Sequence, residues 1–309
     1  MTGEPRTAVV IVTHNTRDDV LRCLDSLGAR GDRPADHRPD QPPDEIVVVD
    51  TGSTDGTVDA VLAARPDVRV LELANAGFGR GANAGVRVTS ASCVIVANAD
   101  VRFEPGSVAR LADELDDDPT LAAVGPAVVY PDGEPQASAR RLPDLQTAIG
   151  HAVCGRVAPS NRWTRRYREL EHTPSLPRDA DWLSGCALAL RRGAFDEVGG
   201  FDPGYHLYVE DVDLGVRLRA AGWRLRYQPA AGVEHRVGAS TSTARWRSLV
   251  SHARGLDRFV WRQRSGPVSA GLRLVLRVGL VVWVVVTWLW ERTLGAVHST
   301  TGERRAGER

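Results

Sequence analysis

The chain of 309 residues is long enough for one large domain or two small ones, and its 42% of apolar residues can fill a substantial core. Its 39 basic and 39 acidic side chains balance to a net charge of about zero, which argues against nucleic acid as a partner. The cysteines Cys23, Cys93, Cys154 and Cys186 have no paired spacing, which argues against a zinc site or disulfide scaffold and fits a reducing cytosol.

The first hundred residues alternate four times between short apolar strands and helices. The expected strands are 7–13, 46–50, 68–73 and 93–97, and the expected helices are 18–27, 55–64 and 79–89. This alternation predicts an α/β fold with a mainly parallel sheet, helices on both faces, and ligands at the C-terminal ends of the strands. Residues 28–44 are rich in Pro, Asp and Arg, and we expect a mobile surface loop there.

The pattern changes in the second half of the chain. Residues 131–181 carry arginines and prolines with little periodicity, which predicts an irregular segment. Order returns at 182–190 and 195–201, and it is followed by an expected helix at 212–221 and an expected strand at 223–227. We expect the first domain to span residues 1–240, with a basic helix at 245–264 after it.

The C-terminal segment, residues 241–309, has the composition of a membrane-associating tail. Val278–Trp290 carries no charge and includes three tryptophans. As a helix this run reaches only ~20 Å, short of the ~30 Å hydrocarbon core of a bilayer. A helix long enough to span the bilayer would have to include Arg273 and Arg277, whose long side chains could place their charges in the headgroup region. We expect an interfacial or re-entrant helix. The alternatives are a full span and a buried helix in a soluble dimer, which would make the protein a homo-oligomer.

Three groups of polar residues lie at the ends of predicted strands or at the start of a predicted helix: Glu210–Asp213, Asn98–Asp100 and His235. The acidic run at a helix start could be an ordinary cap, and a lone histidine is more often structural. A carboxylate just past a buried strand, however, is costly unless a divalent cation such as Mg²⁺ or Mn²⁺ satisfies it, and an imidazole ligand favours Mn²⁺. A general base together with ligands for a cation is what metal-assisted group transfer requires.

Two further stretches suggest nucleotide recognition. Asp50 ends a predicted strand, where a carboxylate can accept hydrogen bonds from a ribose or a base; an ordinary capped turn is the alternative. The loop Asn75–Gly85 has more glycines than we expect of a helix that only has to pack, and its asparagines offer donors and acceptors. A nicotinamide site is excluded, because no Gly-x-Gly-x-x-Gly follows the first strand.

Taken together, these motifs resemble those of the inverting nucleotide-sugar glycosyltransferases of family two, which have the GT-A fold. The matching stretches are Val12–Asn15, Val49–Asp55, Asn75–Gly79, Asn83–Gly85, Asn98–Asp100, Trp182–Gly185, Gly199–Phe201, Glu210–Leu214, Gly222–Trp223, His235 and Gly238. The match to the rhamnosyltransferase-like branch rests on Arg140–Pro143, Pro159–Asn161, Arg165–Tyr167 and Asp181–Gly185. The sequence departs from the family at Asn98, where relatives often carry aspartate.

The resemblance implies a role for each group of residues. The nucleotide sugar would contact Thr13, Asn15, Asp50, Asp55, Asn75, Gly77, Phe78, Asn83 and Asn98. Asp100 and His235 would bind the divalent cation, and Asp211, with Glu210 beside it, would be the general base. The acceptor side would comprise Trp182, Ser184, Gly185, Tyr208 and Asp213 together with the irregular segment 131–181. Trp182 and Tyr208 could stack on sugar faces, although packing in the core is an equal alternative for Trp182.

The resemblance also implies a reaction: transfer of a sugar with inversion, with dTDP-L-rhamnose as the expected donor. The expected acceptor is a polyprenyl-diphosphate-linked sugar of cell-wall or surface polysaccharide synthesis, used at the cytoplasmic face of the plasma membrane. The alternatives are another donor (UDP-galactofuranose, UDP-glucose or GDP-mannose) or a catalytically silent module that binds a nucleotide sugar.

Overall fold

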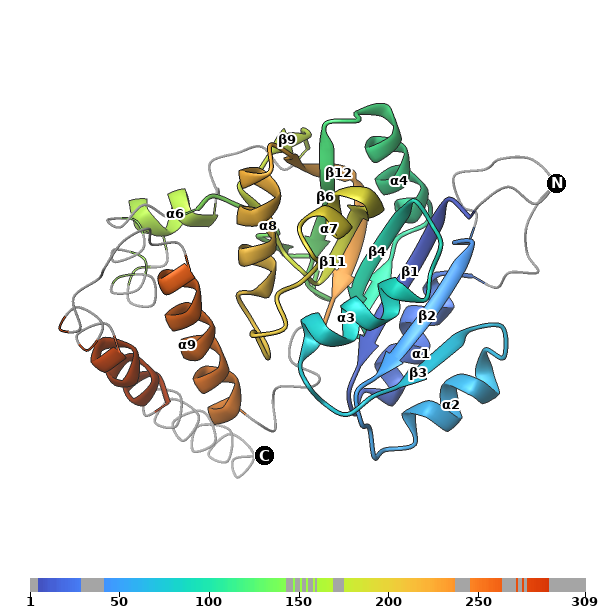
Figure 1. Ribbon diagram of the computed structural model, residues 1–309, viewed down its shortest axis with the longest axis horizontal. Coiled ribbons are helices and arrows are strands. Elements are labelled where there is room, and N and C mark those ends of the chain that lie inside the picture. Colours follow the sequence, from blue (N-terminus) through green and yellow to red (C-terminus); the bar gives the residue numbers. More distant parts are fainter. Residues whose placement is uncertain are drawn as a thin grey trace, which may run out of the picture. The chain divides into compact units, whose positions relative to one another are not determined.

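The computed structural model describes residues 5–28, 42–142, 160–168, 175–236, 245–262 and 277–288, with single positions at 147, 151, 154, 158, 271 and 274 (Figure 1). The chain divides into two compact units, residues 1–206 with 210–240 and residues 207–209 with 241–309. Most of the predicted loop 28–44 and parts of 131–181 and 241–309 lie outside the described residues. The predicted boundary at residue 240 stays a prediction.

The first unit holds all of the described strands and most of the helices. The strands are β1 (Thr7–Thr13), β2 (Glu45–Asp50), β3 (Arg69–Glu72), β4 (Cys93–Asn98), β5 (Val101–Phe103), β6 (Leu121–Val129), β7 (Pro135–Gln136), β8 (Ala139–Arg140), β9 (Arg178–Asp179), β10 (Trp182–Leu183), β11 (Ala187–Arg191) and β12 (Arg224–His235). The helices are α1 (Arg17–Ser26), α2 (Thr57–Ala64), α3 (Phe78–Arg87), α4 (Ser107–Asp117), α6 (Arg162–Arg168), α7 (Arg192–Glu197) and α8 (Glu210–Ala220).

Among the described residues, the main sheet runs in the order β3-β2-β1-β4-β11-β6-β12-β5, with β7 beside β6 and β9 beside β12. The first four strands of this order are parallel, and β12 is parallel to β6. Strand β11 runs antiparallel between β4 and β6. The predicted mainly parallel α/β sheet is therefore confirmed, and one reversed strand lies in its middle.

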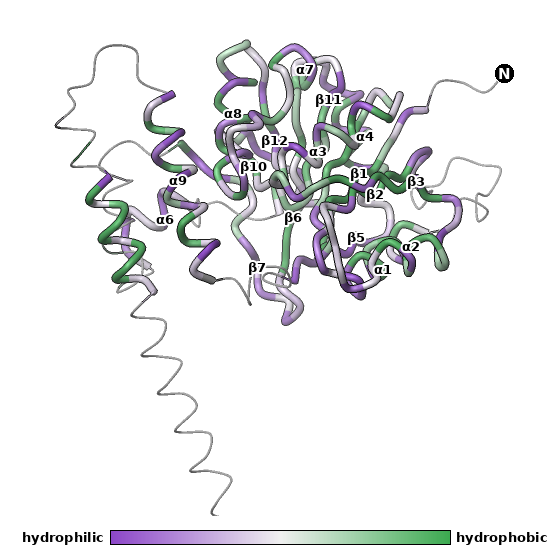
Figure 2. The backbone as a smooth tube through the Cα atoms, turned by 60° about the horizontal axis from the view of Figure 1, so that its bottom comes forward, coloured by the Kyte–Doolittle hydropathy of each residue, from purple (hydrophilic) through white to green (hydrophobic). Residues whose placement is uncertain are grey.

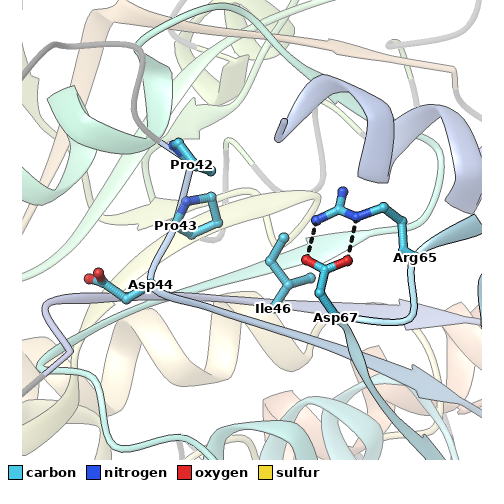
Figure 3. Close-up of a pocket in the computed structure, with 6 residues that line it drawn as sticks. All are labelled: Pro42, Pro43, Asp44, Ile46, Arg65 and Asp67. Carbon is cyan, nitrogen blue, oxygen red and sulfur yellow. Dashed lines mark hydrogen bonds and ion pairs between the residues drawn. The ribbon is translucent and has the colours of Figure 1, made fainter. Parts of the chain in front are cut away.

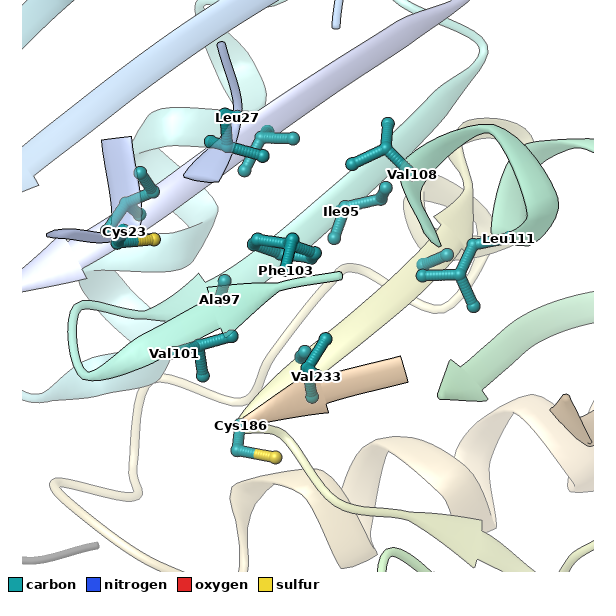
Figure 4. Close-up of a cluster of buried hydrophobic side chains, with 14 of the residues drawn as sticks. Cys23, Leu27, Ile95, Ala97, Val101, Phe103, Val108, Leu111, Cys186 and Val233 are labelled. Carbon is teal, nitrogen blue, oxygen red and sulfur yellow. The ribbon is translucent and has the colours of Figure 1, made fainter. Parts of the chain in front are cut away.

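Helices cover both faces of the sheet because neighbouring residues of a strand point to opposite sides. Val9 and Ile11 of β1 belong to one core cluster, to which α1, α2 and α4 contribute side chains. Figure 4 shows part of this cluster, with Cys23 from α1 and Val108 and Leu111 from α4. Val10 and Val12 belong to the other, with side chains from α3, α7 and α8. The central strands are accordingly hydrophobic along most of their length (Figure 2). This double burial explains their continuous β-branched runs.

The observed bounds of the predicted elements before residue 100 differ by two residues or fewer from the prediction. Three elements that follow, β5, α4 and β6, were not predicted. Helix α8 begins at Glu210 and not at Val212, so the acidic run lies inside its first turn. Strand β12 is longer than the predicted 223–227, because a bulge between Gln228 and Gly232 lets it continue to His235.

In the second unit, α9 (Arg245–Arg262) packs against the helical residues 277–288. Trp246 contacts Trp288, and His252 contacts Trp283, each with ring centroids 5.7 Å apart, so the two helices run antiparallel. Val278, Val281, Val282, Val285 and Val286 are 40–62% exposed. Within the described ranges, no helix combines the length and the apolar character needed to cross a bilayer.

Candidate active site

Asp50 stands at the C-terminal end of β2, beside Thr13 at the end of β1. Its side chain is almost entirely buried, and its Oδ2 accepts hydrogen bonds from the N–H groups of Gly52 (3.0 Å) and Ser53 (2.9 Å). Its Oδ1 is buried and has no hydrogen-bond partner among the described residues. A buried carboxylate oxygen without a donor is unfavourable, so this atom is suited to accept a hydrogen bond from a ligand.

Asn15 links the loop after β1 to the loop after β2. Its backbone is left-handed (φ 51°), a conformation that asparagine tolerates better than most residues. Its Oδ1 accepts a hydrogen bond from the N–H of Thr54 at 2.7 Å, and its own N–H donates to Ser53 Oγ at 2.8 Å. The carbonyl of Thr13 accepts bonds from both the N–H and the hydroxyl of Thr51. Asn15 and Thr13 thereby hold in place the loop that carries Asp50.

Asp55 fixes the start of two helices. Its carboxylate accepts hydrogen bonds from the N–H of Thr57 in α2 and the N–H of Arg17 in α1, both at 3.2 Å. Burial would raise the pKa of Asp55, but the hydrogen bonds from Thr57 and Arg17 outweigh it and lower the pKa below its ordinary value. These bonds account for Asp55 as a cap, and its contact with the nucleoside stays a prediction.

The glycines of the segment 75–85 are required by packing. A Cβ atom on Gly77 would lie 2.2 Å from the carbonyl oxygen of His206, and Gly77 has a φ of 101° that favours glycine. A Cβ on Gly85 would lie 2.3 Å from a methyl group of Val10 in β1. The argument that a packing helix would not need so many glycines is therefore wrong, because α3 approaches the sheet too closely for larger residues.

The two asparagines of this segment differ. Asn83 donates from Nδ2 to the carbonyl of Phe201 (2.7 Å) and accepts the N–H of Phe201 at Oδ1 (2.9 Å), a pair of bonds that explains it without a nucleotide. Phe78 packs edge-on against the ring of Phe201 and donates its N–H to His206, so it too has a structural role. Asn75 is exposed near the end of β3, and its contact with the nucleotide stays a prediction.

Asp100 and His235 meet at the C-terminal end of β4. Strand β12 pairs with β5 in a register that places His235 opposite Val101, so His235 Nε2 lies 3.2 Å from Asp100 Oδ1. Asn98 completes the group, with its Nδ2 3.4 Å from the same ring nitrogen. Burial would lower the pKa of His235, but its hydrogen bonds with Asp100 and Cys186 raise the pKa to about 10.

This pair fits a divalent cation. A carboxylate oxygen and an imidazole nitrogen 3.2 Å apart can both bind one ion at metal–ligand distances of ~2.0–2.6 Å, provided that the ion displaces the proton that Nε2 shares with Asp100. Gln136 of β7 was not among the predicted site residues. Its Oε1 lies 3.0 Å from His235 Nδ1. A bond to Nδ1 leaves Nε2 directed at Asp100. Nothing in the sequence marks Gln136, because its partner is brought to it by the pairing of distant strands. Within the described part of the chain, no three His, Cys, Asp or Glu side chains form a group able to hold a metal.

Asp211 lies in the first turn of α8 and remains partly exposed. Its Oδ2 accepts the N–H of Gly185 at 3.0 Å, and its Oδ1 accepts the N–H of Val212 at 2.8 Å. Burial raises the pKa of this carboxyl above its ordinary value, and the backbone hydrogen bonds from Gly185 and Val212 oppose the rise. Glu210, next to it, is buried with 6% of its surface exposed. Asp211 is thus the accessible and precisely held carboxylate of the acidic run.

Asp213 requires a correction. Its side chain is fully buried, where it accepts a hydrogen bond from the Tyr205 hydroxyl (3.2 Å) and an ion-paired bond from Arg217 Nε (2.7 Å). It is therefore a structural residue of the interior and does not face an acceptor. The sequence contained a sign of this ion pair, because Arg217 lies four residues, about one helical turn, after Asp213.

Trp182 also packs in the interior. It is 5% exposed, its Nε1–H donates to the carbonyl of Arg141 (3.2 Å), and the Arg140 guanidinium lies 5.1 Å from its ring centroid. Of the two roles open to Trp182, packing is the one observed, and the ring is not free to stack on a sugar. Ser184 donates its N–H to Ser138 (2.7 Å), which places Gly185 against Asp211.

Tyr208 belongs to the second unit. It has a left-handed backbone (φ 70°), and its ring centroid lies 5.5 Å from that of His252 in α9. Its side chain is partly exposed. Contact between Tyr208 and an acceptor sugar stays a prediction.

A small pocket elsewhere in the first unit does not belong to this site. It lies at the N-terminal end of β2 and is lined by Pro42, Pro43, Asp44, Ile46, Arg65 and Asp67 (Figure 3). Arg65 and Asp67 form a two-bonded ion pair there, and Asp44 accepts the N–H groups of Arg6 and Thr7. The pocket is at the opposite end of the strand from Asp50, and its polar groups are engaged with one another.

Comparison with known proteins agrees with this fold. The family model described as glycosyl transferase family 2 matches residues 8–199. The chain is 38% identical over 286 residues to the N-acetylglucosaminyl-diphospho-decaprenol L-rhamnosyltransferase of Mycobacterium tuberculosis, covering 89% of this chain and 90% of the relative. It is 29% identical to the pre-mycofactocin glycosyltransferase of the same species, over 74% of this chain and 42% of that one.

Solved structures show the same fold at low identity. The mannosyltransferase PcManGT of Pyrobaculum calidifontis, in complex with GDP-Man and Mn²⁺, has a TM-score of 0.57 at 19% identity, covering 99% of this chain and 81% of that one. GalNAc-T7, crystallised with UDP, GalNAc and Mn²⁺, has a TM-score of 0.55 at 19% identity, covering 75% and 43%. The family model ends before Asp211 and His235, whereas the mycobacterial relative aligns over most of the chain. On these matches and its mainly parallel α/β sheet, the chain belongs to glycosyl transferase family 2.

Proposed function

We propose that this glycosyltransferase moves L-rhamnose from dTDP-L-rhamnose, with inversion, onto a sugar linked through a diphosphate to a polyprenol. The observation that carries the proposal is the 38% identity, over 90% of its length, to the mycobacterial enzyme that rhamnosylates N-acetylglucosaminyl-diphospho-decaprenol. Such a product serves cell-wall or surface polysaccharide synthesis.

The donor end of the proposed site is built on Asp50. Its buried Oδ1, which has no partner among the described residues, can accept a hydrogen bond from the N–H of a thymine ring or from a ribose hydroxyl. The loops tied together by Asn15 hold this carboxylate in place. A thymidine nucleotide would therefore supply the hydrogen-bond donor that this buried oxygen lacks among the described residues.

Asp100 and His235 would hold a divalent cation, Mn²⁺ or Mg²⁺, with Asn98 beside them. Two structurally similar glycosyltransferases were solved with Mn²⁺, which supports this proposal. When bound, the cation supplies positive charge to the leaving diphosphate. Because the protein offers two close ligands, oxygens of the nucleotide and water would complete the coordination.

Asp211 would act as the general base. The oxygen of the acceptor hydroxyl forms a bond to the anomeric carbon while the bond from that carbon to the nucleoside diphosphate breaks, and Asp211 takes the hydroxyl proton. Attack from the side opposite the leaving group inverts the anomeric configuration. The N–H groups of Gly185 and Val212 keep the carboxylate in one orientation while each oxygen retains a lone pair. Such a base contributes roughly 10²–10⁴-fold to the rate.

The second unit would keep the enzyme at the membrane that holds its lipid acceptor. The exposed valines of helical residues 277–288 form an apolar face, and the neighbouring helix α9 presents exposed arginines at positions 247, 254 and 262. An apolar face flanked by arginines is suited to an anionic leaflet. We place the enzyme at the cytoplasmic face of the plasma membrane, where it lies on the bilayer as a peripheral or monotopic protein.

A panel of nucleotide sugars tests the proposal. Purified protein with Mn²⁺ is given a short-chain N-acetylglucosaminyl diphospho-prenol and each of dTDP-L-rhamnose, UDP-galactofuranose, UDP-glucose and GDP-mannose. We expect transfer from dTDP-L-rhamnose alone. Transfer from another donor would reject the rhamnose assignment. Tight binding of nucleotide without transfer or hydrolysis of any donor would indicate a catalytically silent module.

A further inference from the structure

The segment that carries Arg140 and Arg141 is anchored firmly, and neither arginine side chain has been given a role of its own above. Strand β8 pairs antiparallel with β10, with Arg140 opposite Trp182. The N–H of Asp181 donates to the carbonyl of Arg140 at 3.0 Å, and the Asp181 carboxylate accepts the N–H of Leu142 at 2.8 Å. The indole of Trp182 donates to Arg141. The backbone at Arg140 is therefore held on both sides by residues 181 and 182.

The Arg140 side chain is also held, but its terminal nitrogens are not used. The guanidinium lies 5.1 Å from the centroid of the buried Trp182 ring, and its Nε donates to the carbonyl of Ala137 at 3.0 Å. Within the part of the chain that the structure describes, neither Nη atom has a hydrogen-bond or ion-pair partner, and the side chain is partly exposed. Arg140 thus presents two pre-positioned NH₂ groups, the arrangement with which arginine binds phosphate.

Arg140 and the proposed base Asp211 are attached to the same short stretch of chain. Arg140 packs on Trp182, and Gly185, three residues later, donates its N–H to Asp211. The positive charge of Arg140 is close enough to lower the pKa of Asp211, against the larger effect of burial. Even so, the described structure shows no ion pair between the two side chains. A cation near the base but not bonded to it remains available to an anionic group of a substrate.

We propose that the two Nη groups of Arg140 bind a phosphate oxygen of the acceptor's diphosphate, while a hydroxyl of the same acceptor sugar faces Asp211. This inference rests on the proposed function, because it takes the acceptor to be a sugar diphosphate. In such a molecule the phosphate and the ring hydroxyls are separated by about the width of one sugar. Arg140 contacts Trp182 and Asp211 contacts Gly185, so the arginine could bind the phosphate while the carboxylate faces a hydroxyl. The donor diphosphate has its own candidate site at Asp100 and His235.

The test compares two acceptors and two arginine variants. The acceptors are a short-chain N-acetylglucosaminyl diphospho-prenol and an uncharged alkyl glycoside of N-acetylglucosamine. We expect Arg140→Gln to raise KM for the diphosphate acceptor by roughly 10- to 100-fold, the range for hydrogen bonds to a charged group. KM for the uncharged glycoside and KM for the donor should stay unchanged. The matched control is Arg110→Gln in α4, whose guanidinium bonds the Pro105 carbonyl, and it should leave all three constants unchanged.

Each other result overturns the inference in a recognisable way. An equal loss with both acceptors would mean that Arg140 only supports Trp182 and Asp211. A rise in donor KM alone would assign the arginine to the nucleotide diphosphate. If the unaltered enzyme transfers no rhamnose, the proposed function fails, and direct binding of the diphosphate lipid without donor still tests Arg140. Equal affinity of the native protein and Arg140→Gln for that lipid would refute the inference.

Discussion

The side-chain oxygen of Gln136 lies 3.0 Å from His235 Nδ1, and on the other side of the ring Nε2 lies 3.2 Å from Asp100. Because Nδ1–H donates to Gln136, the proton that a cation would displace is the one on Nε2, the nitrogen that faces the carboxylate. The short strand β7 therefore determines which nitrogen of the imidazole can bind a cation.

Gln136→Ala should weaken cation binding about 10- to 100-fold, the usual effect of losing the partner that orients a ligand histidine. Titration of the purified protein with Mn²⁺, followed by calorimetry or by the electron spin resonance of free Mn²⁺, measures the affinity. Gln228→Ala is a matched control, because Gln228 bonds Glu114 at 2.5 Å and has no bond to His235. Equal Mn²⁺ affinities of the native protein and Gln136→Ala would show that the glutamine does not orient the ring.

Asp211→Asn and Asp213→Asn, two residues apart in α8, should differ in their main effect, the first on turnover and the second on stability. Asp211→Asn should lower turnover by at least ~10²-fold at unchanged nucleotide affinity, because an amide cannot take the acceptor proton. It should also cost about 1 kcal/mol of stability, because both carboxylate oxygens accept backbone N–H groups and an NH₂ group cannot. Asp213→Asn should mainly lower the free energy of unfolding, by about 3 kcal/mol, because it breaks a buried ion pair.

Turnover of the two variants with saturating substrates and their urea denaturation curves separate these effects. Native turnover in Asp211→Asn would exclude this residue as the base and turn attention to Glu210. A stable Asp213→Asn with strongly reduced turnover would return Asp213 to the acceptor side.

The pH dependence follows from the raised pKa of Asp211. Because only the ionised carboxyl is a base, turnover should rise with pH, with a midpoint above the ordinary value of about 3.9 for aspartate. For stability the sign is opposite. The folded state holds this proton more tightly than the unfolded state, so the contribution of Asp211 to stability falls as pH rises from the unfolded pKa to the folded pKa.

Urea denaturation of the native protein and Asp211→Asn over this pH range measures that contribution. The free energy of unfolding of the native protein should decline with increasing pH relative to that of Asp211→Asn. A constant difference between the two proteins would mean that the carboxyl has the same pKa in both states.

The exposed valines give a prediction for the membrane. Val282→Asp combined with Val286→Asp should abolish most co-sedimentation with vesicles of phosphatidylglycerol and phosphatidylethanolamine, because it introduces charge into an apolar face. Both side chains are more than half exposed, so the helix should tolerate the change. Leu62→Asp in α2 is the control, an exposed apolar residue of the first unit. Undiminished co-sedimentation of the valine variant would assign membrane binding to another surface.

The sequence predicted those parts of the molecule that depend on local pattern. The β-branched runs of β1, β2 and β4 and the helical spacing of α1 gave bounds within a residue, because double burial leaves a continuous apolar signal. It also singled out Asp100, His235 and Asp211 as candidate site residues, since each stands at the end or start of such an element. The family resemblance then brought them together, and the observed 3.2 Å between Asp100 and His235 agrees with it.

What the sequence could not supply depends on contacts between distant residues. Asp213 and Asp211 look alike in the sequence, but one turns inward to Tyr205 and the other toward Gly185. Gln136 and Arg140 lie in a stretch without periodicity, and their partners are fixed by strand pairing. The glycines of the segment 75–85 are required by close packing, which only the positions of Val10 and His206 in the folded chain reveal.

The insertion of β12 between β6 and β5 also sets a time order for the growing chain. Asp100 leaves the ribosome well before His235, and until β12 arrives most of one edge of β6 is unpaired. Pairings between residues far apart in the sequence form slowly, and open strand edges promote aggregation. The edge of β6 that faces β12 is therefore exposed longest while the chain is being made. The proposed cation ligands Asp100 and His235 come together in the same step, when β12 pairs with β5 and completes the sheet.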